Sequence, residues 1–116
     1  MTTALTRSVL VISAFMFSAV GAQAASLAAQ NGMTLYTFDK DKGGQSVCYD
    51  DCAVNWPPYV GTAADKMPDA WKLVERTDGT MQWTYDGKPV YFFAGDTAKG
   101  DATGDGMGSV WHVIKE

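Results

Sequence analysis

The sequence predicts an all-β fold, a small antiparallel sheet domain built from two internal repeats joined by hairpins. Three observations predict it. Short runs rich in aromatic and β-branched residues are bounded by Gly, Asp and Lys, as strands are. Two Asp-Gly pairs lie between such runs, and this dipeptide is a strong signal for a hairpin. One residue pattern also occurs twice, which indicates a duplicated unit.

The duplication is found when the chain is shifted by 55 positions against itself. Each copy then reads G-x-x-[LV]-Y-x-F-x-x-D, followed by 14 residues and a Trp. The coinciding pairs are Gly32 with Gly87, Leu35 with Val90, Tyr36 with Tyr91, Phe38 with Phe93, Asp41 with Asp96 and Trp56 with Trp111. We therefore predict repeat 1 at about 31–58, an intervening hairpin segment at 59–85 and repeat 2 at about 86–114.

The strands follow from the same patterns. We expect strands at residues 35–38, 71–76, 82–85, 90–93 and 110–114. Turns at Asp78-Gly79 and Asp86-Gly87 separate the third strand from its two neighbours. The stretch 99–108 is too rich in glycine for regular structure and is expected to be a loop.

Residues 1–24 are predicted to be a secretory signal peptide. Arg7 supplies a positive charge ahead of residues 9–20, an uncharged run that is apolar apart from two serines. This run is shorter than the roughly 20 residues that a membrane span needs. Small residues at 21–24 then form an A-x-A arrangement, so we expect cleavage after Ala24.

The remaining residues, 25–116, are expected to form one exported domain, either periplasmic or secreted. No later run could span a membrane, and no cysteine stands at the cleavage site, so no lipid anchor is evident. The net charge of −4 argues against nucleic acid, which is bound by clustered Lys and Arg. The expected partner is an envelope or extracellular molecule whose identity the sequence does not give.

Both copies of the motif fit Y-x-[FWY]-x-x-D, at residues 36–41 and 91–96. Together with CYDDCAVNWPP at 48–58 and the Gly-Asp-rich loop that leads to Trp111-His112, they resemble the secreted repeat of unknown function. The resemblance covers essentially the whole chain after the signal peptide. It implies an exported, duplicated domain and supplies no activity. Members of this family are often described as predicted lipoproteins, but this chain lacks the lipidation cysteine.

The repeated motif has two interpretations. The two aromatics of each copy are two positions apart, so on a strand they share one face, and each Asp follows just past the strand end. The interpretation we favour is two core aromatics with an Asp that caps a turn. The alternative is a paired aromatic–carboxylate binding site. The residues concerned are Tyr36, Phe38, Asp41, Tyr91, Phe93 and Asp96.

Cys48 and Cys52 form a C-x-x-x-C pattern with three interpretations. An even number of cysteines in an exported protein most often forms disulfides, and here the loop would be very short. The alternative is a periplasmic copper-binding or copper-handling protein, in which both thiolates bind Cu(I) with His112 or a methionine as a third ligand. The third interpretation is thiol redox activity, although thiol exchange prefers C-x-x-C. We expect a disulfide and no cofactor.

An enzyme is not expected. No nucleophile–base pair stands out, and G-x-S-x-G, P-loop and H-E-x-x-H motifs are missing. Asp101 and Asp105 match part of a calcium-loop pattern. A weak enzymatic hypothesis pairs His112 with Asp101 or Asp105 as an acid/base pair. The sequence therefore predicts an exported, non-catalytic binding or accessory module.

Overall fold

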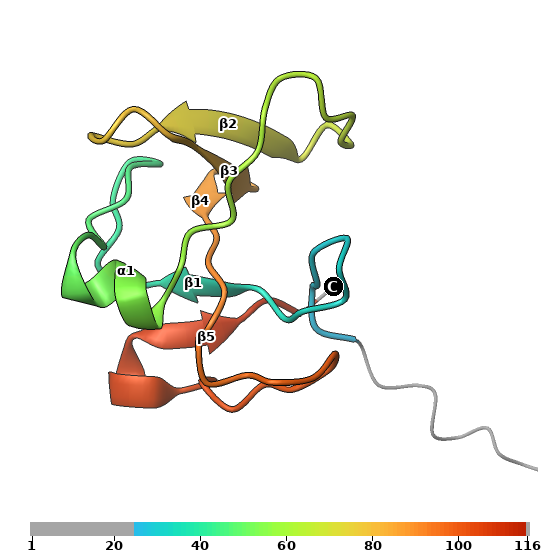
Figure 1. Ribbon diagram of the computed structural model, residues 1–116, viewed down its shortest axis with the longest axis vertical. Coiled ribbons are helices and arrows are strands. Elements are labelled where there is room, and N and C mark those ends of the chain that lie inside the picture. The colour runs from blue at the N-terminus through green and yellow to red at the C-terminus, as the bar shows by residue number, and fades with distance from the viewer. Residues whose placement is uncertain (1–24, 116) are drawn as a thin grey trace, which may run out of the picture.

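Strands make up most of the regular structure in the computed structural model, which describes residues 25–115 (Figure 1). The elements are β1 (Tyr36–Phe38), α1 (Asp51–Asn55), β2 (Trp71–Glu75), β3 (Met81–Tyr85), β4 (Lys88–Pro89), the 3₁₀ turn η2 (Met107–Ser109) and β5 (Trp111–Val113). The predicted all-β class is confirmed. The predicted signal peptide, residues 1–24, lies outside the described residues.

The strands form two small antiparallel sheets, which lie one above the other in Figure 1. One sheet pairs β1 with β5, and the other has the order β2-β3-β4. In the first sheet Thr37 lies opposite His112, and Phe38 lies opposite Trp111. Because side chains alternate along a strand, Thr37 and His112 share one face of this sheet, whereas Phe38 and Trp111 share the other.

Both predicted Asp-Gly turns form. Asp86 and Gly87 connect β3 to β4 as a two-residue loop, with φ angles of 51° and 84°. Positive φ at both positions is the geometry of a type I′ turn, which favours Asp and Gly and matches the twist of a hairpin. In the β2–β3 hairpin, Gly79 has a φ of 88°, and Asp78 Oδ1 accepts a 3.0 Å hydrogen bond from the Thr80 amide.

The strand predicted at 90–93 is wrong. The chain forms β4 just before it, and Tyr91 then makes only isolated bridges, one to Tyr36 and one to Pro58. The Phe92 amide donates to the Pro57 carbonyl, but Pro57 has no N–H to return the bond, so a regular ladder does not form along this side. The closing strand is also shorter than predicted, and neither α1 nor η2, which overlaps the end of the predicted loop, was expected.

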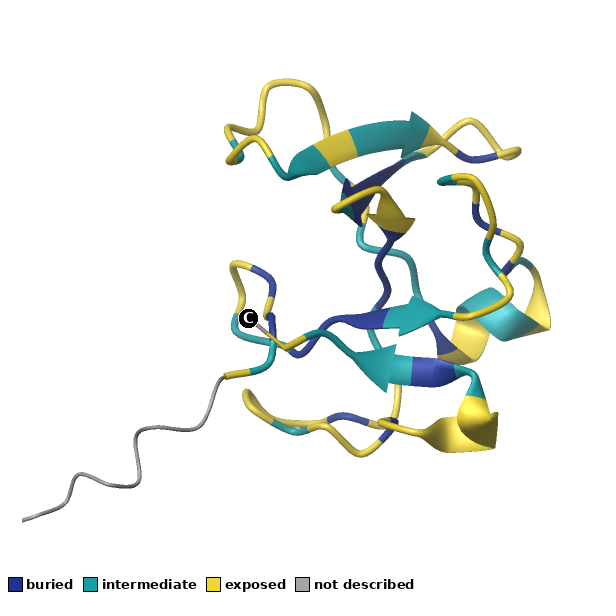
Figure 2. Ribbon diagram, turned by 180° about the vertical axis from the view of Figure 1, so that it is seen from behind, coloured by how far each residue is buried: buried dark blue, intermediate teal, exposed yellow. Residues whose placement is uncertain are grey.

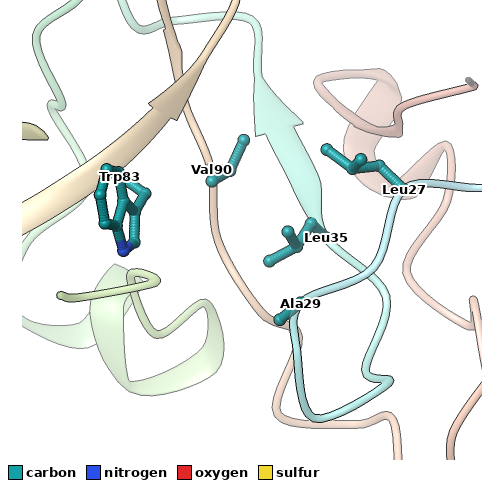
Figure 3. Close-up of a cluster of buried hydrophobic side chains, with 5 residues drawn as sticks. All are labelled: Leu27, Ala29, Leu35, Trp83 and Val90. Carbon is teal, nitrogen blue, oxygen red and sulfur yellow. The ribbon is translucent and has the colours of Figure 1, made fainter. Parts of the chain in front are cut away.

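Two clusters of buried side chains form the core. The first, which we call the hairpin core, consists of Leu27, Ala29, Leu35, Trp83 and Val90 (Figure 3). The second, the inter-repeat core, consists of Tyr36, Cys48, Trp56, Tyr91 and Trp111. Figure 2 shows that buried positions follow the strands and the segments facing them, whereas η2 and most of α1 are exposed.

Candidate functional site

The two repeats meet at their motif tyrosines. The Tyr36 amide donates a 2.9 Å hydrogen bond to the Tyr91 carbonyl, and the Tyr91 amide donates a 3.0 Å bond to the Tyr36 carbonyl. Both side chains are fully buried. Because equivalent residues exchange equivalent bonds, the repeats are related here by a local twofold axis.

The tyrosine hydroxyls cross between the repeats. The Tyr36 hydroxyl donates a 2.7 Å hydrogen bond to Asp96 Oδ2, and the Tyr91 hydroxyl donates a 2.7 Å bond to Asp41 Oδ2. The other oxygen of each carboxylate accepts a backbone N–H from the loop of its own repeat. Asp41 Oδ1 accepts the Val47 amide, and Asp96 Oδ1 accepts an amide in the loop of repeat 2. Each tyrosine therefore holds a carboxylate that orders a loop of the opposite repeat.

The remaining motif aromatics form a column of four stacked rings. Trp56 and Trp111 stack at its centre, with centroids 3.9 Å apart and an interplanar angle of 2°. Phe38 stacks on Trp111 at 4.1 Å, and Phe93 stacks on Trp56 at 4.3 Å. Each phenylalanine thus covers the tryptophan of the other repeat. A ligand at the motif would have to displace these contacts.

Burial shifts the pKa values of three motif side chains. Burial raises the pKa of Tyr36, and the Asp96 carboxylate raises it further. Burial likewise raises the pKa of Tyr91, with a further contribution from Asp41. Burial also raises the pKa of Asp41 above 3.8, against the opposing effect of its hydrogen bonds from Tyr91 and Val47. At neutral pH both tyrosines are therefore neutral donors.

A buried arginine that the sequence analysis missed connects the intervening hairpin to repeat 1. Arg76 is 3% exposed. Its Nη1 donates to Ser46 Oγ at 3.0 Å and to Gln82 Oε1 at 2.8 Å, while Nη2 donates to the Cys48 carbonyl at 2.7 Å. Ser46 Oγ in turn contacts the Tyr91 hydroxyl. In the sequence Arg76 and Gln82 flank the predicted Asp78-Gly79 turn. An Arg beside a turn is usually exposed to solvent, so the sequence does not indicate that Arg76 is buried.

The predicted disulfide is confirmed. Cys48 and Cys52 are joined by an S–S bond of 2.05 Å. Copper binding at these two residues would therefore first require reduction, because the thiolate is the metal ligand. Among residues 25–115 no group of three or more His, Cys, Asp or Glu side chains is arranged to hold a metal ion.

A groove lies between the β1–β5 sheet and the β3–β4 turn. It consists of two cavities of about 280 and 410 Å³, whose linings share Thr37, Asp39 and Lys88. The smaller cavity extends to Asp41, and the larger extends along β5 to Lys115. We call these two cavities together the inter-sheet groove. Its β-sheet wall is the face of β1 and β5 opposite the stacked aromatics.

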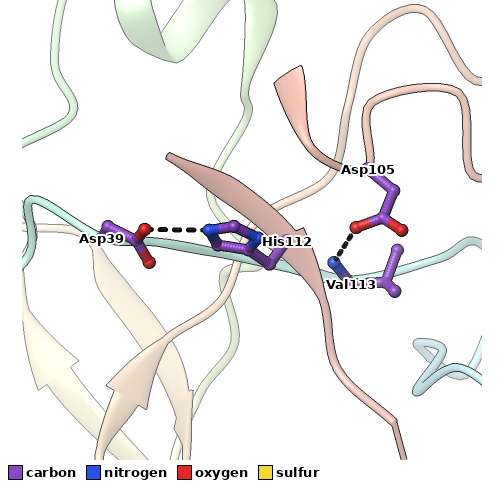
Figure 4. Close-up of polar contacts among 4 residues, drawn as sticks. All are labelled: Asp39, Asp105, His112 and Val113. Carbon is purple, nitrogen blue, oxygen red and sulfur yellow. Dashed lines mark hydrogen bonds and ion pairs between the residues drawn. The ribbon is translucent and has the colours of Figure 1, made fainter. Parts of the chain in front are cut away.

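His112 lies in the wall of this groove and pairs with Asp39 (Figure 4). The distance from His112 Nε2 to Asp39 Oδ2 is 2.8 Å, and the two side chains are 42% and 54% exposed. The acid/base partners hypothesised from the sequence are wrong. Asp105 instead accepts the Val113 amide at 3.0 Å, and Asp101 accepts amides of its own loop. No pattern in the sequence indicates Asp39, because nothing in it places residue 39 beside residue 112.

Comparison with known proteins gives one match. A family model described as a secreted repeat of unknown function matches residues 20–59 and 72–115. No curated protein and no solved structure matches significantly. Within the described range, no helix has the length and apolar character required to cross a membrane.

Proposed function

The chain belongs to the family of the secreted repeat of unknown function, and on that premise we propose that it is an exported, non-catalytic binding module. We further propose that the inter-sheet groove is its binding surface and that the ligand is a small molecule. The domain boundaries, the cleavage after Ala24 and a location that is either periplasmic or secreted stay predictions.

One observation carries the proposal. The motif tyrosines point inward and hydrogen-bond to the opposite repeat, whereas Thr37 and His112, on the other face of the same strands, line the groove. The motif residues Phe38 and Asp41 contribute to the lining of its smaller cavity. Thr37 and His112 are therefore held by paired strands, Asp39 lies directly after β1, and all three line the groove. A volume of about 410 Å³ lies within the range of small-molecule sites, roughly 300–1,000 Å³. Polar side chains on a fixed scaffold are suited to binding.

The groove chemistry favours binding over catalysis. His112 hydrogen-bonds Asp39, and in residues 25–115 no Ser, Thr or Cys side chain hydrogen-bonds to its ring. A nucleophile activated by histidine must lie within hydrogen-bond reach of it.

Nuclear magnetic resonance tests this proposal directly. The isotope-labelled exported protein is mixed with the low-molecular-mass fraction of its own growth medium. We expect amide shifts at Thr37, Asp39, Lys88 and His112. Lys88→Met should weaken them, because Lys88 lines both cavities. Lys66→Met is the matched control, since Lys66 is an exposed lysine outside either cavity lining.

Two results would overturn the proposal. If the shifts fall outside the groove, or none occur, the groove is not the binding surface. If the bound component is recovered in a chemically altered form, the module is catalytic.

A further inference from the structure

The short loop closed by the disulfide holds one residue in an unusual backbone conformation. Asp50 has a φ of 54° and a ψ of −124°. These are the angles of the first central residue of a type II′ turn, a position that favours glycine because a side chain is strained there. The Cys52 amide donates a 3.0 Å hydrogen bond to the Tyr49 carbonyl and completes the turn. Within residues 25–115, the Asp50 side chain makes no hydrogen bond to the start of α1 that would offset the strain.

The chain on either side of Asp50 is anchored, so the turn is held while the disulfide is intact. Before the turn, the Cys48 carbonyl accepts Arg76 Nη2 at 2.7 Å, and Arg76 Cζ lies 4.2 Å from the centroid of the Tyr49 ring. After the turn, the S–S bond ties Cys52 back to Cys48. A disulfide that closes a strained loop is reduced more readily than a relaxed one, because reduction releases the strain.

The two cysteines differ in access. Cys48 is fully buried in the inter-repeat core, whereas Cys52 is partly exposed on α1. An incoming thiolate therefore attacks Cys52 Sγ: a new S–S bond forms there, the bond between the two cysteines breaks, and Cys48 leaves as a thiolate that takes up a proton. With a dithiol as the reductant, its second thiolate then displaces Cys52. The dithiol becomes a disulfide, and its two electrons reduce the two cysteines to thiols.

The disulfide loop is also connected to a wall of the inter-sheet groove. Val47, which precedes Cys48, donates its amide to Asp41 Oδ1 at 2.8 Å, and Asp41 lines the smaller cavity. The Cys48 amide donates to Ser46 Oγ at 3.2 Å. That hydroxyl contacts the Tyr91 hydroxyl, which donates to the other oxygen of the same carboxylate. Both oxygens of Asp41 are therefore oriented by contacts that lead back to Cys48.

We propose that the disulfide between Cys48 and Cys52 is a reversible redox switch rather than a permanent cross-link. In the oxidised protein, the turn at Asp50 is held in its strained conformation and the Asp41 carboxylate is fixed in the groove wall. Reduction by a thiol releases the turn, and the Asp41 carboxylate loses its fixed orientation. This inference goes beyond the proposed function, because it holds whether or not the groove binds a ligand.

A thiol–disulfide equilibrium tests the strain. The full-length exported protein is equilibrated with reduced and oxidised dithiothreitol, and its oxidised fraction is measured by alkylation and intact mass. Asp50→Gly should raise the equilibrium constant for disulfide formation about fivefold or more, because glycine adopts these angles without strain. Asp51→Gly is the matched control, since Asp51 is another exposed aspartate of the loop but its φ is not positive. The control should leave the constant unchanged or lower it, because a glycine there only adds flexibility.

Amide spectra of the labelled protein test the connection to the groove. Reduction of the wild type should shift the amides of Asp41 and Tyr91 as well as those of residues 47–53. A Cys48→Ser, Cys52→Ser double variant should show the reduced pattern at Asp41 and Tyr91 with or without the reductant, which separates loss of the bond from effects of the reductant itself.

Two results would overturn the switch. If Asp50→Gly raises the equilibrium constant no more than Asp51→Gly does, the disulfide does not hold the turn in a strained conformation. If reduction shifts only the amides of residues 47–53, the state of the disulfide does not reach the groove.

Discussion

At the scale of single residues, the motif tyrosines act on the opposite repeat rather than on their own. Tyr36 holds Asp96, and the Tyr36 hydroxyl also accepts the Gly104 amide at 3.2 Å. Tyr91 holds Asp41 in the same way. Removal of either hydroxyl would leave a buried or half-buried carboxylate short of a donor, although the aromatic ring and its packing would be kept.

We therefore expect Tyr36→Phe and Tyr91→Phe each to lower the free energy of unfolding by about 1–3 kcal/mol, the usual effect of leaving a charged group without its hydrogen bond. Denaturant unfolding measures the loss. Tyr59→Phe is the control, because within residues 25–115 its hydroxyl makes no side-chain hydrogen bond in the structure, and the change should be close to zero. A loss no larger than that of the control would contradict the role assigned to the hydroxyls.

The raised pKa of Asp41 predicts a pH dependence of stability. The folded protein binds a proton at Asp41 more readily than the unfolded chain does, because burial disfavours the carboxylate. As the pH falls through the raised pKa towards 3.8, the wild type should gain stability relative to Asp41→Asn, which does not titrate. Unfolding free energies of both proteins across acidic pH measure the difference. A difference that is constant with pH would contradict the raised pKa.

At the scale of elements, the disulfide fixes the short segment between the Gly43-Gly44 turn and α1. Cys48 is buried, its carbonyl accepts Arg76 Nη2, and the Cys52 carbonyl accepts the Trp56 amide at the end of α1. The disulfide therefore connects Cys48, the residue to which Arg76 attaches the hairpin, with Cys52 in α1. α1 is the helical turn that positions Trp56. Its loop is short, since the two cysteines are 4 positions apart.

A Cys48→Ser, Cys52→Ser double variant should lose about 2 kcal/mol of unfolding free energy, at the low end for disulfides because the closed loop is short. Reduction of the wild type by a dithiol should cause the same loss, as measured by denaturant unfolding. The reductant should leave the double variant unchanged. A wild type whose stability does not respond to reduction would show that the bond does not constrain this segment.

The elements that the sequence predicted correctly are those determined by residues close together in the chain. Asp86-Gly87 forms its hairpin because the two residues themselves favour positive φ. The prediction of a strand at 90–93 failed because of Pro57, which is distant in sequence and cannot donate to the Phe92 carbonyl. The position of Arg76 and the pair of Asp39 with His112 likewise depend on contacts between segments. Such contacts leave no periodic signal in a single sequence.

At the scale of the whole molecule, neither repeat has a complete core alone. The inter-repeat core takes Tyr36, Cys48 and Trp56 from repeat 1 and Tyr91 and Trp111 from repeat 2. The ring column alternates between the repeats along its length. The repeats should therefore unfold as one cooperative unit, although the sequence presents them as two copies.

A double-mutant cycle on Trp56 and Trp111 tests this cooperativity. Trp56→Phe and Trp111→Phe should each cost about 1–3 kcal/mol, the range for most core substitutions. The double variant should cost less than the sum by about 0.5–1.5 kcal/mol, since the two rings stack on each other and each single change already weakens that contact. Trp71→Phe with Trp111→Phe should be additive, because Trp71 packs on the hairpin core. Two results would contradict this expectation: additive losses for Trp56 and Trp111, or amide exchange that shows one repeat unfolding before the other. Either result would mean that each repeat is stable on its own and that the contacts between the repeats are not needed to complete a core.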